Sequence, residues 1–488
     1  MSRIMRTAGF SRLSAARNIV GFALGLSLVS GVAAQGSTPV ASPEASPVAS
    51  PVAVAPGQLT ATRPYLIATD PSTLSISPIL TAGETIGDYQ MAGVPDGLGA
   101  FKDGSDVVLF VNHELTTVED ANISDARVSR LVLDGTTGAV KSGEYIYDGT
   151  EGFERLCSAY MAGPWDGFDK PTFLTGEETT GSPKGGLSVA IDGATGKPTE
   201  LPWLGHIDHE NQVAIPGFTG KTVIVTTDDN SDGSEVYLYV ADSPADVLAG
   251  KGQLYVFKAD NAAGTADIAK GTELTGTFEP IGQADNTDGD ALQAAADAAK
   301  AFKFVRTEDV TYDRTNTTTI YFTDTGDDQD PNLAADGTPF TKNGRLYTMT
   351  LDPADPTKVS GFKVLLDGDK GDDILNPDNV DANKTTIMLQ EDRNGYNRDE
   401  NFDDTGRILA YDIASGTVTP IAKVDQSDGS GALDPGDEAG SWESSGIINV
   451  EDIYGPGAWL VDVQAHEIKV PQFGGEDEGG QLLLIRQT

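Results

Sequence analysis

The sequence predicts an all-β protein, a six-bladed β-propeller whose ring is closed by an N-terminal strand that joins the C-terminal blade. Amphipathic helical patterns are scarce after residue 60, and the best is the alanine-rich stretch Ala291 to Phe302. Short apolar runs that end in acidic residues or histidine recur six times, and a polar segment precedes each run. Third strands with a Gly-x-Leu-Tyr-like start follow most of them, as at Gly252–Tyr255 and Gly344–Tyr347. Units of three or four strands at such a period indicate a propeller.

The repeat can be followed unit by unit. The apolar runs are Val108–Glu114, Phe173–Glu178, Val223–Asp229, Ile320–Asp328, Ile387–Asp392 and Trp459–His466. The polar segments before them are Pro95–Asp96, Cys157–Ser158, His209–Glu210, Glu308–Asp309, Pro377–Asn379 and Glu443–Ser444. The last unit ends at its third strand, so we expect the segment Leu74 to Ile86 to supply the fourth and remove the open edge. A β-solenoid is the rival fold, but its period would be shorter and more regular.

The chain divides into three predicted parts. Residues 1–34 resemble a secretory signal peptide, with a basic start, the apolar run Ile19 to Val32 and a small-residue cleavage site. No adjacent arginine pair is present, which favours general secretion over the twin-arginine route. Residues 35–60 form an Ala/Ser/Pro-rich disordered spacer, and residues 61–488 form the propeller. We expect a secreted or envelope-associated protein without a stable membrane span after cleavage, although an uncleaved anchor stays open.

Charge and cysteine content limit the partners. The chain has 74 acidic and 33 basic residues and a formal net charge of −41. This balance excludes nucleic acid, which requires clustered Lys and Arg, and it fits a protein that holds cations. The one cysteine, Cys157, excludes an internal disulfide. We expect a monomer whose partners are metal ions and a small substrate.

Equivalent positions of a propeller form a ring around its axis, and here they carry acidic residues. The predicted ring contains His113, Glu114, Cys157, Glu177, Glu178, Glu210, Asp228, Asp229, Glu308, Asp309, Glu391, Asp392, Glu443, Asp462 and His466. So many carboxylates repel one another, and calcium, which takes six to eight oxygen ligands, is the simple remedy. A thiolate and imidazoles beside carboxylates suit iron or zinc better. The alternatives are a buried packing role for Cys157 and local hydrogen bonds for the histidines.

Arg306 lies two residues before Glu308 and is one of few basic residues in these motifs. Its planar guanidinium would suit a phosphate group beside a metal–carboxylate cluster. The alternative is a salt bridge that neutralises neighbouring acids. A Gly-x-Ser-x-Gly nucleophile motif and a P-loop are both absent from the sequence.

At these positions the chain resembles the PhoX family of secreted bacterial alkaline phosphatases. The matching stretches are Asn112–Glu114, Cys157, Thr175–Glu178, His209–Glu210, Thr227–Asp229, Arg306–Asp309, Pro377–Asn379 and Gln390–Asp392. The resemblance implies a six-bladed propeller that holds iron and calcium and hydrolyses phosphate monoesters. It implies the Cys157 thiolate on iron, and Glu178, Glu210 and Glu308 as carboxylate ligands. Arg306 would face the phosphate, and Arg306 and Glu308 would be the catalytic residues.

Two other functions stay open on the sequence. A calcium-dependent lactonase or phosphotriesterase would keep the propeller and change the bond that is hydrolysed. A calcium-stabilised surface propeller would display a binding face and catalyse nothing.

The resemblance to the PhoX family also implies Asp229 and Asp309 as calcium ligands or as residues that hold those ligands.

Overall fold

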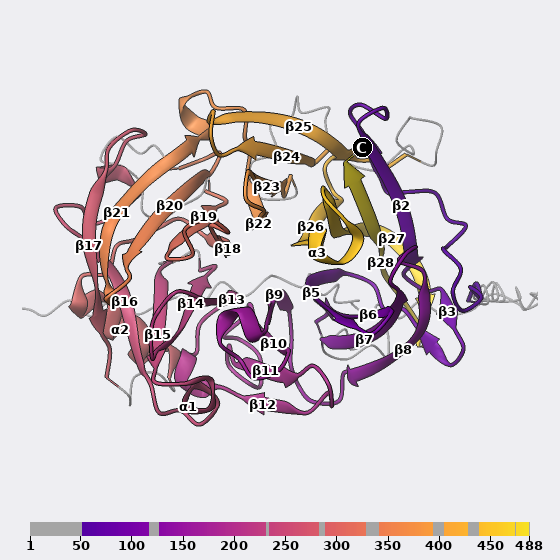
Figure 1. Cartoon of the computed structure of the whole chain (residues 1–488), viewed down its shortest axis with the longest axis horizontal. Helices are drawn as coiled ribbons and strands as arrows, with labels where there is room; N and C mark the ends of the chain where they lie inside the picture. Colours follow the sequence, from indigo (N-terminus) through magenta and orange to yellow (C-terminus); the bar gives the residue numbers. More distant parts are fainter. Residues whose placement is uncertain are drawn as a thin grey trace, which may run out of the picture. The chain divides into compact units, whose positions relative to one another are not determined.

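β-Strands form nearly all of the regular structure and surround a common centre (Figure 1). The computed structural model describes residues 51–116, 126–230, 234–282, 288–327, 341–393, 405–427, 439–473 and 475–487. The predicted signal peptide and most of the predicted spacer lie outside these residues, so both stay predictions. No helix within the described ranges is long and apolar enough to cross a membrane.

Four sheets contain four or five strands each, in spatial orders that the sequence repeat anticipates. The first has the order β5-β6-β7-β8, with bounds Pro95–Asp103, Asp106–His113, Arg127–Asp134 and Val140–Tyr147. The second has the order β12-β11-β10-β9, with bounds Pro198–Glu200, Ser188–Asp192, Thr172–Glu177 and Leu156–Ala162. The third has the order β1-β25-β24-β23-β22, with bounds Leu66–Ala68, Thr417–Val424, Arg407–Asp412, Thr386–Glu391 and Pro377–Ala382. The fourth has the order β2-β28-β27-β26, with bounds Leu74–Thr81, Gly475–Gln487, Ala458–Gln472 and Glu443–Asn449.

A nine-stranded sheet occupies the rest of the circle, because two sets of strands pair at their outer edges through β17 and β21. Its order begins β13-β14-β15-β16-β17, with bounds His209–Ile215, Thr222–Asp228, Val236–Ala241, Gln253–Ala259 and Leu274–Pro280. It continues β21-β20-β19-β18, with bounds Asp355–Asp367, Arg345–Asp352, Thr319–Asp324 and Thr307–Tyr312. The expected third strand at Gly252–Tyr255 is in fact part of the fourth, since β15 precedes it and buries five of its six residues.

Short elements connect these sheets. They are the hairpin β3 (Thr85–Ile86) and β4 (Tyr89–Gln90), the helices α1 (Pro244–Leu248), α2 (Gly289–Ala299) and α3 (Glu451–Tyr454), and the 3-10 turns η1 (Pro164–Asp166), η2 (Pro202–Leu204), η3 (Thr265–Asp267) and η5 (Gly368–Lys370). The alanine-rich stretch expected to be helical forms α2, whose first turn is capped by the Asp288 side chain.

The innermost strands form a closed ring of neighbours. Each of β5, β9, β13, β18, β22 and β26 is the edge strand of its set, and their labels surround the centre in Figure 1. Strand β5 contacts β9, and the contacts continue through β13, β18 and β22 to β26, which contacts β5 again. The fold is therefore all-β and propeller-like.

The seam of the ring joins segments from the two ends of the described chain. Strand β2 pairs antiparallel with β28, from Leu74 opposite Gln487 to Thr81 opposite Gln481. The segment expected to complete the last sheet thus does so. Strand β1 also pairs with β25, which the sequence pattern did not predict. Residues 53–60 hydrogen bond to the folded body, with the Thr60 amide on the Ile79 carbonyl.

We expect Ile79→Ala to destabilise the protein by about 2–5 kcal/mol, because the side chain is fully buried between β2 and its neighbouring sheet. The same substitution at Ile67, whose side chain is 48% exposed, serves as the control and should cost within about 1 kcal/mol. Chemical denaturation of both variants measures the difference. If Ile79→Ala lowers the free energy of unfolding no more than the small loss expected for Ile67→Ala, the seam strand does not contribute to the core.

Candidate functional site

Each inner strand begins with a β-bulge. The pairing with its neighbour advances three residues on the inner strand for two on the partner, in all six inner strands. A bulge bends the strand and redirects side chains, and bulges are common beside active sites. The first residues of the six bulges are Asp96, Cys157, Glu210, Glu308, Asp378 and Ser445. All six line one cavity of about 520 Å³, which we call the acidic cavity.

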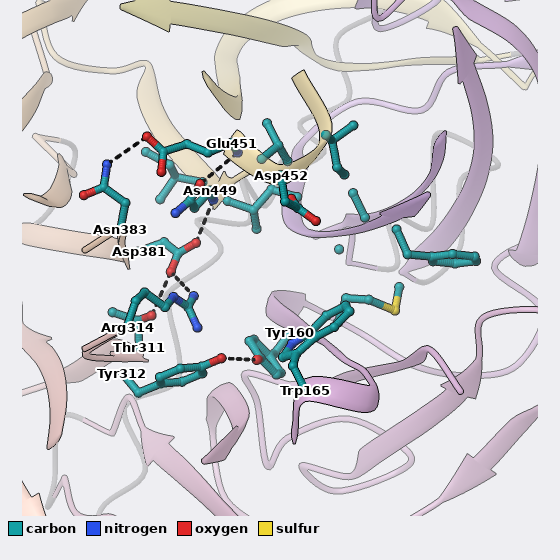
Figure 2. A pocket seen from close by; sticks show the side chains of 18 of the residues that line it. Tyr160, Trp165, Thr311, Tyr312, Arg314, Asp381, Asn383, Asn449, Glu451 and Asp452 are labelled. Carbon is teal, nitrogen blue, oxygen red and sulfur yellow. Dashed lines mark hydrogen bonds and ion pairs between the residues drawn. The ribbon is translucent and has the colours of Figure 1, made fainter. Parts of the chain in front are cut away.

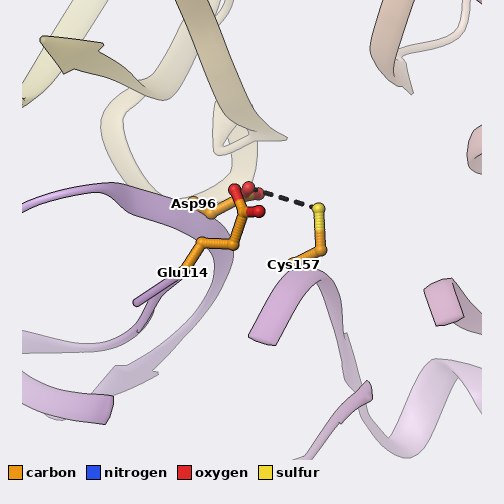
Figure 3. Close-up of side chains that lie close together, drawn as sticks. All are labelled: Asp96, Glu114 and Cys157. Carbon is orange, nitrogen blue, oxygen red and sulfur yellow. Dashed lines mark hydrogen bonds between the residues drawn. The ribbon is translucent and has the colours of Figure 1, made fainter. Parts of the chain in front are cut away.

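The remaining walls come from segments at the same end of the ring. They are Glu114, Thr116, Arg155, Glu178, Arg306, Asp392, Glu443, Gln464 and His466. Glu114 and Glu178 directly follow β6 and β10, so they reach the mouth from the second strands. Figure 3 shows Asp96 and Glu114 turned toward the Cys157 thiol, which donates a hydrogen bond of 3.3 Å to Asp96 Oδ2.

Four groups of side chains in the acidic cavity have ligand atoms within 4.8 Å of one another. They are Asp96–Glu114–Cys157, Cys157–Glu178–Glu210, Glu210–Glu308–Asp378 and Asp378–Asp392–Glu443. Consecutive groups share Cys157, Glu210 and Asp378, so they form a continuous arc around the mouth. Such an arc could hold several cations side by side.

The electrostatics of the acidic cavity favour multivalent cations. Eight carboxylates line it, against two arginines and one histidine. Burial raises the pKa of Asp96, Glu210 and Asp378, and neighbouring carboxylates raise it further. Burial likewise raises the pKa of the Cys157 thiol, and Asp96 adds to the shift. Asp96 Oδ1 is buried without a hydrogen-bond partner among the described residues. The donor set therefore fits hard cations, with one thiolate available for a softer metal.

Two arginines supply positive charge at the mouth. Arg306 Nη2 lies 2.7 Å from Asp229 Oδ2 and 3.3 Å from Glu308 Oε1. Arg155 lies 3.0 Å from Glu114 and 2.6 Å from Glu178. Arg306 therefore lines the acidic cavity and also forms the expected salt bridges with neighbouring acids.

Both arginines have left-handed backbone conformations, with φ 49° for Arg155 and 56° for Arg306. Each lies two residues before a bulge residue, and Val94 and Asn376 share this position and a positive φ. Such a conformation is unfavourable for these residue types and persists only where the surrounding structure enforces it. The turn carries the chain from the mouth into the inner strand.

His466 also faces the acidic cavity. Burial lowers its pKa, but the hydrogen bond to Glu478 and the Glu443 carboxylate, 4.0 Å from Nε2, prevail and raise the pKa to about 11. The ring nitrogen Nδ1 lies 2.5 Å from Glu478 Oε2. The two carboxylates therefore favour the protonated form of the imidazole.

The paired acids in the sequence divide into two roles. The first acid of a pair accepts backbone N–H groups of nearby loops: Glu177 from Glu154 and Leu187, and Asp228 from Asp208. Glu391 likewise accepts the N–H of Leu375, at 2.9 Å. In two of the pairs the second acid lies at the mouth, as Glu178 and Asp392 do, whereas Asp229 lies outside the cavity lining and pairs with Arg306.

The predicted site residues fall into two groups, those that line the acidic cavity and those that do not. Those that line the acidic cavity are Glu114, Cys157, Glu178, Glu210, Arg306, Glu308, Asp392, Glu443 and His466. Those outside its lining are His113, Glu177, Asp228, Asp229, Asp309, Glu391 and Asp462.

Two of the residues outside the lining have clear local roles. The buried His113 ring bonds the Gly93 carbonyl and the Ser129 hydroxyl, and burial lowers its pKa to about 3. Asp309 accepts hydrogen bonds from Asn211 Nδ2 and from the backbone N–H of Val380. It lines a separate cavity at the other end of the inner strands.

Sequence reasoning missed Asp96, Asp378 and Arg155. Asp96 and Asp378 stand in the recurring polar segments at the same offset as Glu210 and Glu308, and that offset could have identified them. Arg155 precedes Cys157 by two residues, as Arg306 precedes Glu308.

The geometry defines an all-β, propeller-like protein in which buried acids and one thiol surround the mouth of a ring of inner strands. The sequence matches the family described as alkaline phosphatase PhoX over residues 172–443. The chain therefore belongs to the PhoX family, as its motifs indicated, and is an alkaline phosphatase-type hydrolase. No curated protein matches it in sequence.

One solved structure has a similar fold. Pseudomonas fluorescens PhoX in complex with vanadate, a transition state analogue, has a TM-score of 0.59 and 14% sequence identity, covering 88% of this chain and 97% of that chain. The GH43_1 enzyme from Xanthomonas citri complexed with xylotriose has a TM-score of 0.34 and 10% identity, covering 84% and 91%. A glycosyl hydrolase from Bacteroides ovatus has a TM-score of 0.32 and 10% identity, covering 68% and 87%. The last two likenesses are too low to support an argument.

We expect calcium to stabilise the protein most at high pH. Without metal, the acids with raised pKa bind more protons folded than unfolded, so stability should fall as pH rises above their unfolded values of about 4. Saturating calcium should raise Tm at about pH 8 and flatten its pH dependence. Scanning calorimetry with calcium or with a chelator measures both effects.

Asp378→Asn should weaken the calcium effect, because Asp378 belongs to two of the four groups. Asp242→Asn is the control, since its side chain is 79% exposed and pairs only with Lys221 among the described residues. Identical Tm values with and without calcium at high pH would contradict a calcium site.

Proposed function

We propose that the protein is a secreted, metal-dependent phosphomonoesterase that acts at the acidic cavity. The observation that carries the proposal is the continuous arc of ligand groups around Cys157, flanked by Arg155 and Arg306. Membership of the PhoX family supports the phosphate monoester as substrate. Secretion is proposed from the N-terminal sequence.

Calcium and iron are the proposed metals. Cys157, Glu178 and Glu210 form the group that contains the thiol, and they would hold iron. The all-carboxylate groups, which include Glu308 and Asp378, would hold calcium. When bound, such metals supply Lewis-acid stabilisation of phosphoryl oxygens and an activated oxygen nucleophile.

The protein's own side chains would bind and orient the phosphoryl group. Arg306 presents a planar guanidinium whose N–H groups match phosphate oxygens. Its ion pairs with Asp229 and Glu308 fix the guanidinium before the substrate arrives, so little reorganisation is needed. Arg155 directly precedes β9, which β13 separates from β18, and it would contact the same group from its own bulge turn because it lines the same cavity. The protonated His466 would add positive charge beside them.

The architecture is proposed to be a six-bladed propeller in a monomer. The ring of six inner strands and the bulge in each of them support this count. The nine-stranded sheet would then be two blades joined through β17 and β21.

Arg306→Ala should lower kcat/KM on an aryl phosphate by about 100-fold or more, because it removes a charged contact to the phosphoryl group. Arg130→Ala is the control: Arg130 pairs with Glu144 on the surface and should retain activity. Steady-state kinetics with p-nitrophenyl phosphate measure both variants. Equal activity of Arg306→Ala and the parent would exclude the assigned role.

Cys157→Ser should remove iron and leave calcium largely in place, since only the thiol-containing groups lose their soft ligand. Elemental mass spectrometry of the purified mature protein gives both metal contents, and aryl phosphate hydrolysis should fall with the iron. Calcium as the only metal in the parent, unchanged in Cys157→Ser, would contradict the iron assignment. Hydrolysis of lactones or phosphotriesters in the absence of monoesterase activity would contradict the substrate class.

A further inference from the structure

A second cavity, of about 700 Å³, lies at the opposite end of the inner strands. The same strands serve both ends: β9 carries Cys157 at the acidic cavity and Tyr160 at the second one, and β18 carries Glu308 and Tyr312. We call this second cavity the aromatic cavity. Its volume is in the range typical of small-molecule sites.

Aromatic side chains form one wall of this cavity. The indole of Trp165, on η1, is 54% exposed, which makes it the most exposed large aromatic side chain among the described residues. Asp166 holds this turn in place, because it accepts hydrogen bonds from the Gly163 N–H at 2.9 Å and the Tyr160 hydroxyl at 3.0 Å. An exposed indole on a fixed turn is a stacking surface that loses little freedom when a ligand binds.

Planar polar side chains form the opposite wall. Figure 2 shows Tyr160 and Trp165 across the cavity from Asp381, Asn383, Asn449 and Glu451. Arg314 lies between the two walls, with its guanidinium over the Tyr312 ring at 3.9 Å from the ring centroid. Asp381 accepts from the Thr311 hydroxyl at 2.7 Å, from Arg314 Nη2 at 2.8 Å and from the Asn449 N–H at 2.7 Å. Asn383 Nδ2 donates to Glu451 Oε1 at 3.2 Å. These bonds connect three inner strands, so the polar wall is formed before any ligand binds.

The two cavities differ in the charge of the residues that line them. The aromatic cavity is lined by four acids, Asp309, Asp381, Glu451 and Asp452, and by three bases, Lys102, Arg314 and Lys384. Its lining is therefore close to neutral, whereas eight acids face two arginines and His466 in the acidic cavity. Neither a multivalent cation nor a phosphorylated ligand is favoured by a nearly balanced lining.

We propose that the aromatic cavity binds an uncharged saccharide. A pyranose ring has an apolar C–H face that would stack on Trp165 and hydroxyl groups at its edge that would bond Arg314, Asn383 and Glu451. Stacking on one wall and planar hydrogen-bonding groups on the other match this chemistry, and neutrality of the ligand matches the lining. The site is separate from the acidic cavity and does not depend on the function proposed there.

Intrinsic fluorescence of the full chain provides the first test. Of the four tryptophans, Trp442 and Trp459 are buried, so a ligand on Trp165 should produce a saturable blue shift. The probes are cellotriose, maltotriose, xylotriose, mannotriose and tri-N-acetylchitotriose, and at least one should bind with a dissociation constant of about 1 mM or tighter. The absence of a saturable change with all of these probes would overturn the proposal.

Variants locate the binding site. By calorimetry, Trp165→Ala should weaken binding at least about tenfold, and Glu451→Gln, which keeps the side-chain shape, about threefold or more. Trp203→Phe is the matched control, because Trp203 does not line the aromatic cavity and should leave both affinity and blue shift intact. Unchanged affinity in Trp165→Ala, with circular dichroism confirming the fold, would overturn the proposal.

Discussion

One extra residue at the start of every inner strand is the constraint on which the functional end of the molecule depends. In a regular strand, successive side chains alternate between faces, and every second residue here would enter the apolar layer between sheets. The bulge interrupts this alternation, so Glu210 and Glu308 face the mouth while Asn211 and Asp309 line the aromatic cavity. The backbone departs from the ladder there, and buried acids such as Glu177 satisfy the loop amides that the departure leaves unpaired.

A layer of hydroxyl and amide groups separates the two cavities. Asn379 Nδ2 donates to Ser158 Oγ at 2.6 Å, and Ser158 in turn donates to Glu210 Oε1 at 2.6 Å. Asn211 donates to Asp309 on the other side. These hydrogen-bond donors stabilise the ionised forms of Glu210 and Asp309, whereas burial alone would favour the neutral forms. The ring can therefore keep an intensely acidic end and a nearly neutral end on the same strands.

Sequence periodicity was sufficient for the all-β class, the recurring strands and the seam, because apolar runs and turn residues are local signals. It also located the acidic mouth, since recurrence identifies equivalent positions. It could not tell Glu177 from Glu178, because which of two adjacent acids faces the mouth depends on the register of β10 against the bulged strand β9, which has no local signature. The sequence pattern also could not predict the pairing of β17 with β21 at the outer edge, because the hydrophobic pattern of a strand does not specify which distant strand it pairs with. Family membership confirmed the resemblance, while the role of each ligand residue stays a prediction.

The seam also couples the acidic cavity to segments that are far apart in the sequence. Strands β5 and β26 are neighbours across it, and they carry Asp96 and Glu443, which stand at the two ends of the ligand arc. The sheet at the seam needs β2 from one end of the described chain and β28 from the other. The two ends of the arc are therefore brought together only when β2 and β28, which are far apart in the sequence, have paired. Completion of the acidic cavity thus depends on contacts of large sequence separation, whose loop-closure entropy must be overcome before they form.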